Sequence, residues 1–106
     1  MTELTQPRVT RYTLGGWDPL TPSISVELTC EAGQGPHKPP HDWWAVRDGR
    51  GCCLNSDGEW EYEPQPSSRK DDFLARTRFT EQGAIAVARV RYDRDQRHAD
   101  ERRTDV

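Results

Sequence analysis

The placement of proline and glycine divides this chain into two parts that favour different structures. All eight prolines lie at or before Pro66, and seven of the eight glycines lie at or before Gly58. Because both residues interrupt regular structure and occupy turns, the first two thirds favour short strands joined by turns. The last third contains only Gly83 of this kind, so it favours a helix or a polar tail.

The apolar content is small, which limits the chain to one small domain. It has 106 residues, 32% of them apolar, and its mean hydropathy of −1.03 leans toward disorder. Four tryptophans, three tyrosines and a net charge of only −3 favour a folded domain instead. We therefore expect a single domain over residues 1–106, with an ordered body over about residues 8–92 and a polar tail over about residues 93–106.

The lengths of the apolar runs and the number of cysteines together predict the cellular compartment of the protein. The longest apolar runs, residues 43–46 and 84–88, are far shorter than a bilayer span, and the first ten residues lack the pattern of a signal peptide. The cysteines are odd in number, and a disulfide between the adjacent Cys52 and Cys53 would be strained. We expect a cytoplasmic protein with reduced thiols and no contact with a membrane.

Period-two alternation predicts the strands. Residues 24–30 place Ile24, Val26, Leu28 and Cys30 on one face and polar side chains on the other, which is typical of a strand with one buried face. Further strands are expected over residues 9–14, 43–47, 51–54 and 59–63.

Two expected turns fix the register of the last three strands. A two-residue turn at Asp48-Gly49 places Trp44 opposite Cys53, and a four-residue turn over residues 55–58 places Cys53 opposite Trp60. A slip of one residue would bury glutamates, which is costly. The expected apolar face consists of Trp44, Val46, Cys53, Trp60 and Tyr62, and the opposite, solvent-facing side consists of Glu59, Glu61 and Glu63.

Capping patterns predict two helices. Ser68 with Asp71 three residues later forms a capping box for a short helix that turns Phe73 and Leu74 inward. Thr80 is expected to cap a second helix. Its apolar positions are Ala84, Ile85, Val87, Ala88 and Tyr92.

Two alternatives stay open in the last third. Residues 84–92 are rich enough in β-branched residues to form a strand instead, and the tail is either a charged helical extension or disordered. The expected fold class is α+β, with a small antiparallel sheet of four or five strands, one or two helices packed on one face and a polar C-terminal tail.

Residues 43–88 carry a distinctive series of short motifs. They are WAV in a strand, a Gly and Cys before a GEW hairpin, then EP-x-PS-x-R-x-D, an RF and an Ala-rich helix. In these features the segment resembles a group of short uncharacterised proteins encoded by actinobacteria and their phages. The chain departs from this pattern in its His/Pro loop, its doubled cysteine and Gly83. The resemblance implies an origin and a fold but carries no biochemical activity.

A zinc site is one hypothesis for the function. Cys30, His37, His41 and Cys52 supply ligands that zinc prefers, and the His-x3-His spacing is that of many zinc fingers. No Cys-x2-Cys knuckle is present, and two prolines between the histidines exclude a helical pair. Buried free cysteines are the more common outcome, so zinc is an alternative and no cofactor is expected.

A hydrolase site is a weaker hypothesis. His37 or His41 with Asp42 and a nucleophile such as Cys52 would supply the residue types of a catalytic triad. The sequence has no nucleophile elbow or oxyanion loop, so a solvated polar loop is favoured and we do not expect an enzyme.

Nucleic-acid binding is a further alternative, carried by Arg89, Arg91, Arg94 and Arg97. Interspersed aspartates supply intrahelical partners and would repel phosphates, and the chain as a whole is acidic. A solvated helix is the more common meaning of such mixed charge, so nucleic acid is not expected as the main partner.

The aromatic residues favour protein binding. Trp43 is expected on the face opposite Trp44, and Trp17 in a loop, and exposed tryptophans are enriched at interface hot spots. With Glu59 and Glu61 on a strand face, they are the candidate contact residues. We expect a non-enzymatic accessory protein, encoded by a phage or mobile element, that binds another protein or a second copy. The alternative is a small zinc-stabilised or nucleic-acid-associated domain.

Overall fold

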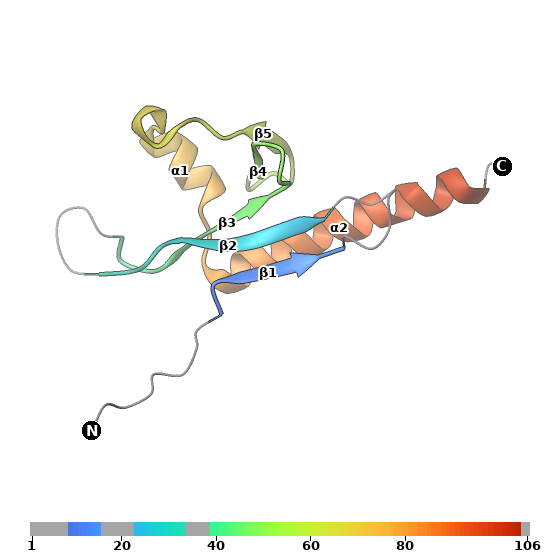
Figure 1. Ribbon diagram of the computed structural model, residues 1–106, viewed down its shortest axis with the longest axis horizontal. Coiled ribbons are helices and arrows are strands. Elements are labelled where there is room, and N and C mark those ends of the chain that lie inside the picture. The colour runs from blue at the N-terminus through green and yellow to red at the C-terminus, as the bar shows by residue number, and fades with distance from the viewer. Residues whose placement is uncertain (1–8, 16–22, 34–38, 105–106) are drawn as a thin grey trace, which may run out of the picture.

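A computed structural model describes residues 9–15, 23–33 and 39–104 of the chain. Five strands form one antiparallel sheet in the order β1-β2-β3-β4-β5, so each strand pairs with its neighbour in sequence (Figure 1). The strands are β1 (Arg11–Leu14), β2 (Ile24–Cys30), β3 (Trp43–Arg47), β4 (Cys52–Leu54) and β5 (Trp60–Tyr62). A 3-10 turn, η1 (Pro66–Ser68), and two helices, α1 (Asp71–Thr77) and α2 (Glu81–Thr104), follow. The expected α+β class is confirmed.

One face of the sheet packs against α2 and forms the apolar core. Val26 pairs with Val46 and Leu28 with Trp44, so these side chains share that face. Ala84 and Ala88 of α2 are fully buried against them, and Tyr12 stacks beside Trp44 at 5.8 Å between ring centroids. The buried core cluster consists of Ile24, Val26, Trp44, Val46, Leu54, Ala84 and Ala88.

The opposite face is covered by α1 near β4 and β5. Cys53 pairs with Arg47 and with Glu61, so its side chain points away from the α2 face, yet it is fully buried. Phe73 and Thr77 of α1 are buried as well, and the backbone oxygen of Arg76 accepts a hydrogen bond from Ser56. The two helices therefore lie on opposite faces of the sheet.

Phe79, in the link between the two helices, pairs with the sheet. Its backbone N–H and C=O bond those of Trp44, both at 2.9 Å. Because β2 already pairs with the other edge of Trp44, this bridge lies on the edge that faces β4. The chain thus passes from one face of the sheet to the other while its backbone groups stay bonded.

The expected register of the last three strands is wrong, by three residues between β3 and β4 and by one residue between β4 and β5. Arg47, not Trp44, lies opposite Cys53, and Leu54, not Cys53, lies opposite Trp60. Cys53 therefore leaves the expected apolar face and Leu54 joins it. Tyr62 stays beside Trp60 in the alternation but is 70% exposed, so it is not a core residue.

Both turns have the same wrapped structure, which explains the error in register. The side-chain oxygen of Asp48 accepts the N–H groups of residues two and four positions later, and Asn55 does the same. In each turn a glycine three residues after the wrapping residue, Gly51 or Gly58, has positive φ. Asx residues stabilise such turns locally, which lengthens both connections beyond the expected two and four residues.

The helix starts differ in how well the sequence predicts them. Thr80 caps α2 as expected, since its hydroxyl accepts the N–H of Gly83 at 3.1 Å. A Cβ at Gly83 would come within 3.0 Å of that hydroxyl, so glycine suits this position. The expected capping box of Ser68 is wrong, because Ser68 belongs to η1 and α1 starts after Lys70 without a side-chain cap.

Residues 84–92 are helical, so the strand alternative is wrong. The burial of Ala84 and Ala88, four residues apart, is helical periodicity. α2 continues through the polar tail to Thr104, which matches the helical alternative for that segment.

The substitution Trp44→Ala should cost about 3–5 kcal/mol of unfolding free energy, because Trp44 is fully buried in the core and its removal leaves a large cavity. Urea denaturation followed by far-UV circular dichroism measures this loss. Trp43→Ala is the matched control, since Trp43 is only partly buried, and it should cost about 1 kcal/mol. Equal losses for the two variants would contradict the assigned core.

Candidate functional site

The protein-binding candidates from the sequence are not gathered on one surface. Trp43 is partly buried at the start of β3, and Trp17 lies outside the described residues. Glu61 forms a 2.8 Å ion pair with Arg76 on the α1 face. Glu59 is exposed on its side chain and pairs with Arg91 and Arg94 of α2. The glutamates of β5 and its ends thus bind arginines of the chain and are not a free acidic edge.

The hypothetical zinc ligands are separated. Cys30 pairs with Trp43 at one end of β3, whereas Cys52 follows the turn at the other end, so roughly 15 Å of strand lies between them. His37 lies outside the described residues. Among the residues that the structure describes, no three His, Cys, Asp or Glu side chains lie close enough to hold a metal ion.

The hypothetical hydrolase residues do not form a triad in the described part of the chain. Nδ1 of His41 lies 2.9 Å from the backbone oxygen of Asp42, whose carboxylate accepts the N–H of Ala32. Cys52 lies at the far end of β3, on the turn side. The described histidine, carboxylate and thiol therefore do not converge.

The four arginines proposed for nucleic acid do not share one face of α2. At the helical repeat, Arg89, Arg91, Arg94 and Arg97 spread over about 200° of the circumference. Arg91 is largely buried and packs over the ring of Trp60, donates to the backbone oxygen of Gly58 and pairs with Asp95. One of the four is thus a structural contact, and the rest do not form a stripe that matches a phosphate backbone.

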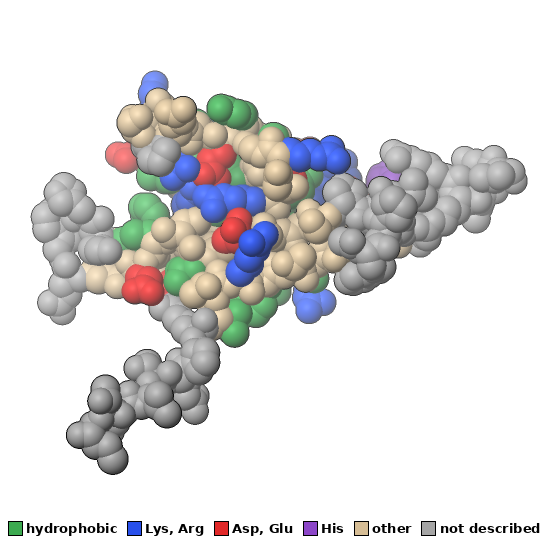
Figure 2. Space-filling view, in the orientation of Figure 1, with side chains coloured by type: hydrophobic (Ala, Val, Ile, Leu, Met, Phe, Trp, Pro, Cys, Tyr) green, Lys and Arg blue, Asp and Glu red, His purple; other side chains and the backbone are tan. Residues whose placement is uncertain are grey.

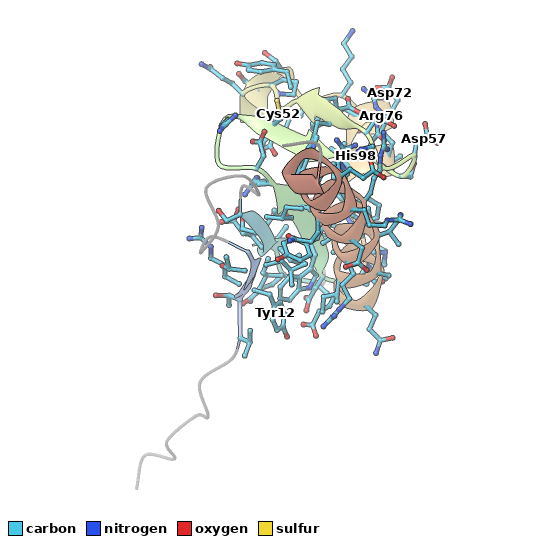
Figure 3. The ribbon with its side chains drawn as sticks, turned by 90° about the vertical axis from the view of Figure 1, so that its right-hand side faces the viewer. Tyr12, Cys52, Asp57, Asp72, Arg76 and His98 are labelled. Carbon is cyan, nitrogen blue, oxygen red and sulfur yellow. The ribbon has the colours of Figure 1, made fainter. Side chains whose placement is uncertain are left out.

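A groove lies between α2 and the turn that joins β4 to β5, and we call it the Val90 groove. It encloses about 340 Å³, and Val90 at its edge is 70% exposed, which is unusual for a large aliphatic side chain. In Figure 3, which looks along α2 from its C-terminal end, Asp57 of that turn and Tyr12 of β1 lie on opposite sides of the helix. The groove is lined by Ser56, Asp57, Gly58, Ala86, Val87, Val90, Arg91 and Arg94.

The sequence contained a signal for this groove. Val90 falls half a turn away from the apolar stripe of α2 and has no place in the core. The turn at Asn55 forms the wall of the groove opposite α2. Its length could not be predicted from the sequence, because it depends on the hydrogen bonds that the Asn55 side chain accepts.

Apart from the Val90 groove, a cluster of charged residues around Glu63 joins α1 to the sheet. Arg47 donates two hydrogen bonds to the Glu63 carboxylate, at 3.0 and 2.8 Å, and Arg69 donates a third. Arg78, whose side chain is 2% exposed, lies 3.5 Å away, and Glu27 also pairs with Arg47. Figure 2 shows basic and acidic side chains side by side on the face turned to the viewer. We call this set of five residues the Glu63 cluster.

The Glu63 cluster holds its central carboxyl ionised. Burial alone would raise the pKa of Glu63, but the hydrogen bonds and charges of Arg47, Arg78 and Arg69 outweigh it and lower the pKa below 4.5. A cavity of about 330 Å³ lies beside the cluster, and both Glu27 and Arg47 line it. With acidic and basic groups already paired, the cluster serves to hold α1 on the sheet.

Burial makes Cys53 a poor nucleophile. Burial first, and the nearby charge of Glu63 second, raise the pKa of the Cys53 thiol to about 11. A thiol with such a pKa is almost entirely protonated at neutral pH, so Cys53 serves as a small core residue.

Neither a family model, nor a curated protein, nor a solved structure matches this chain. No helix among the described residues is long and apolar enough to cross a membrane.

The substitution Glu63→Gln should cost about 3–5 kcal/mol at pH 7, because Arg69 and the buried Arg78 lose the carboxylate that they share and Arg47 keeps only Glu27. The folded-state pKa is lowered, so the stability that the carboxylate supplies is present above pH 4.5 and disappears as pH falls through the folded pKa. Urea denaturation at pH 7 and in acid should show the gap between the two proteins closing.

Glu59→Gln is the matched control, since the Glu59 side chain is 58% exposed, and it should change stability by less than about 1 kcal/mol. A gap for Glu63→Gln that does not vary with pH would contradict the role of its charge.

Thiol labelling tests the environment of Cys53. Iodoacetamide at mildly alkaline pH should modify the partly exposed Cys30 and Cys52 in the folded protein and leave Cys53 unmodified until denaturant is added. Mass spectrometry of peptides identifies each site. Modification of Cys53 as fast as Cys52 without denaturant would show that this part of the core is open.

Proposed function

We propose that the chain is a non-enzymatic accessory protein that acts by binding another protein, with the Val90 groove as its contact surface. The observation that carries the proposal is the exposure of Val90, 70%, at the edge of a groove that Ala86 and Val87 also line. An apolar patch framed by polar residues is typical of protein contact sites.

The energetics of the groove suit a protein side chain. Covering an exposed valine contributes about 1.5–3 kcal/mol, which is the size of an interface hot spot. The groove is bordered by Asp57 on the turn and Arg94 on α2, which supply opposite charges at its rim. Such a rim suits a partner segment that places an aliphatic side chain in the centre and polar groups outside.

The charges around the groove favour a protein over a nucleic acid. Glu59 pairs with both Arg91 and Arg94, and Asp57 lies beside them. These carboxylates would repel phosphates at the point where the arginines are closest to the groove. Glu59 therefore enters the proposal as a residue that positions the two arginines, while Trp43, at the far end of β3 from the turn, is outside the proposed surface.

The proposal extends to compartment and origin. Three free cysteines, one of them buried in the core, suit a cytoplasmic protein whose thiols stay reduced. The resemblance of residues 43–88 to short proteins of actinobacteria and their phages supports a role as an accessory protein of a phage or mobile element.

Val90→Asp should abolish partner binding and leave the fold intact, because a charge in the apolar centre of a contact is costly while the same charge in water is not. The tagged chain is used to capture proteins from a lysate of the organism that encodes it. Each captured protein, whether a different protein or another copy of the chain, is then purified and titrated by calorimetry. Binding should weaken at least about tenfold.

Val9→Asp is the matched control, since Val9 is the other exposed valine among the described residues, at 52%, and precedes β1, away from the groove. It should bind as the unmodified chain does. Equal binding by the Val90→Asp and unmodified chains, or no captured protein that binds when purified, would contradict the proposed surface.

A further inference from the structure

The outward side of α2 carries a straight stripe of four exposed residues. Ala86, Val90, Asp93 and Arg97 follow one another at intervals of four, three and four residues. At the helical repeat they lie within about 60° of one another, on the side opposite Ala84 and Ala88. We call these four residues the outer stripe of α2.

The two charged residues of the outer stripe are available for a partner. Within the part of the chain that the structure describes, neither Asp93 nor Arg97 forms an ion pair, although they lie four residues apart. Their neighbours are engaged, since Arg91 pairs with Asp95 and Arg94 with Glu59. The stripe therefore offers one negative and one positive group beside the exposed Val90.

The helix is longer than the sheet that supports it. α2 packs against β1, β2 and β3, and its C-terminal half runs beyond the ends of these strands (Figure 1). A helical segment of this length is marginal in water unless one of its faces packs against something. A contact along the outer stripe would supply that packing.

We propose that the outer stripe binds a second copy of the chain, with the two α2 helices antiparallel and the two-fold axis beside Asp95. In this register Asp93 lies opposite Arg97 of the second copy, and Arg97 lies opposite its Asp93, so both ion pairs form by symmetry. By the same symmetry, Val90 of each copy lies opposite position 100 of the other helix, near the end of the contact. The partner's C-terminal half then lies along the side of α2 that the sheet leaves exposed.

The two folded bodies do not collide in this arrangement. Each sheet covers only the N-terminal half of its own α2, on the side away from the stripe, so the bodies are displaced to opposite ends of the helix pair. The contact is one helix face from each copy, which places it among small, transient interfaces. The inference rests on the proposed function, because Val90 belongs to both surfaces, and it names the partner.

Sedimentation equilibrium of the full chain tests the pairing. The unmodified chain should pass from monomer to dimer between about 10 µM and about 1 mM, with a dissociation constant on the order of 100 µM at low salt that weakens as salt rises. Asp93→Arg alone and Arg97→Asp alone should each be monomeric over this range, because each places like charges opposite one another.

The register is tested by mixing the two variants. The Asp93→Arg variant carries arginine at both paired positions, and the Arg97→Asp variant carries aspartate at both, so an equimolar mixture should form a heterodimer. The double variant Asp93→Arg/Arg97→Asp exchanges the two charges within one chain, so it should form a homodimer. Arg50→Asp, in the exposed turn after β3, is the control and should dimerise as the unmodified chain does. Circular dichroism confirms that every variant is folded.

Three results would overturn the inference. They are an unmodified chain that stays monomeric to about 1 mM, a dimer that Asp93→Arg does not weaken, and a mixture of the two single variants that stays monomeric. A monomeric chain that still binds a different protein through Val90 would overturn only the choice of partner. Partner binding that Val90→Asp leaves unchanged would instead overturn the proposed function.

Discussion

The bridge between Trp44 and Phe79 is the contact on which the two-sided fold depends. Its two backbone hydrogen bonds place the link between α1 and α2 at the edge of β3, so one helix can cover each face of the sheet. The Trp44 side chain then fills the centre of the α2 face, where it is fully buried. One residue therefore fixes both the path of the chain and the apolar core.

The two faces of the sheet are stabilised by different physical means. Leu, Ile, Val and Phe make up only 16 of the 106 residues, and those that are buried lie mostly on the α2 face. On the α1 face, Phe73 and Cys53 are joined by the Glu63 cluster, in which arginines from β3, from the segment before α1 and from its end share one carboxylate. A paired ionic cluster thus covers the face for which the apolar residues are too few, and removing Glu63 would leave the buried charge of Arg78 without its counter-ion.

Features carried by local pattern could be predicted, and features carried by distant contacts could not. The bounds of β2 and β3 follow from alternation and apolar runs, and the Thr80 cap follows from its position. The register after β3 failed because side-chain oxygens of Asp48 and Asn55 wrap and lengthen both turns. The Glu63 cluster joins residues 27 to 78, and no periodicity of the sequence marks such a group. Of the residues proposed for binding, Val90 has only one signal in the sequence: it is an apolar residue that lies outside the buried apolar stripe formed by Ala84 and Ala88.

The length of α2 links the fold to the proposed surface. Ala84 and Ala88, with Ile85, Val87 and Tyr92 packed against the same core, hold the helix on the sheet. The last bond that joins it to the β4–β5 turn within the described chain comes from Arg94. Residues beyond that point add little to the core of the monomer, so their helical order must be supported by charge pairs or by packing from outside. Arg91–Asp95 supplies an ion pair on the flank of the helix, and Nδ1 of His98 lies 3.6 Å from the Glu101 carboxylate. On the outer stripe Asp93 and Arg97 are unpaired in the described chain and stand beside an exposed valine. That is the side of the helix on which a second helix would add ion pairs and cover the exposed valine.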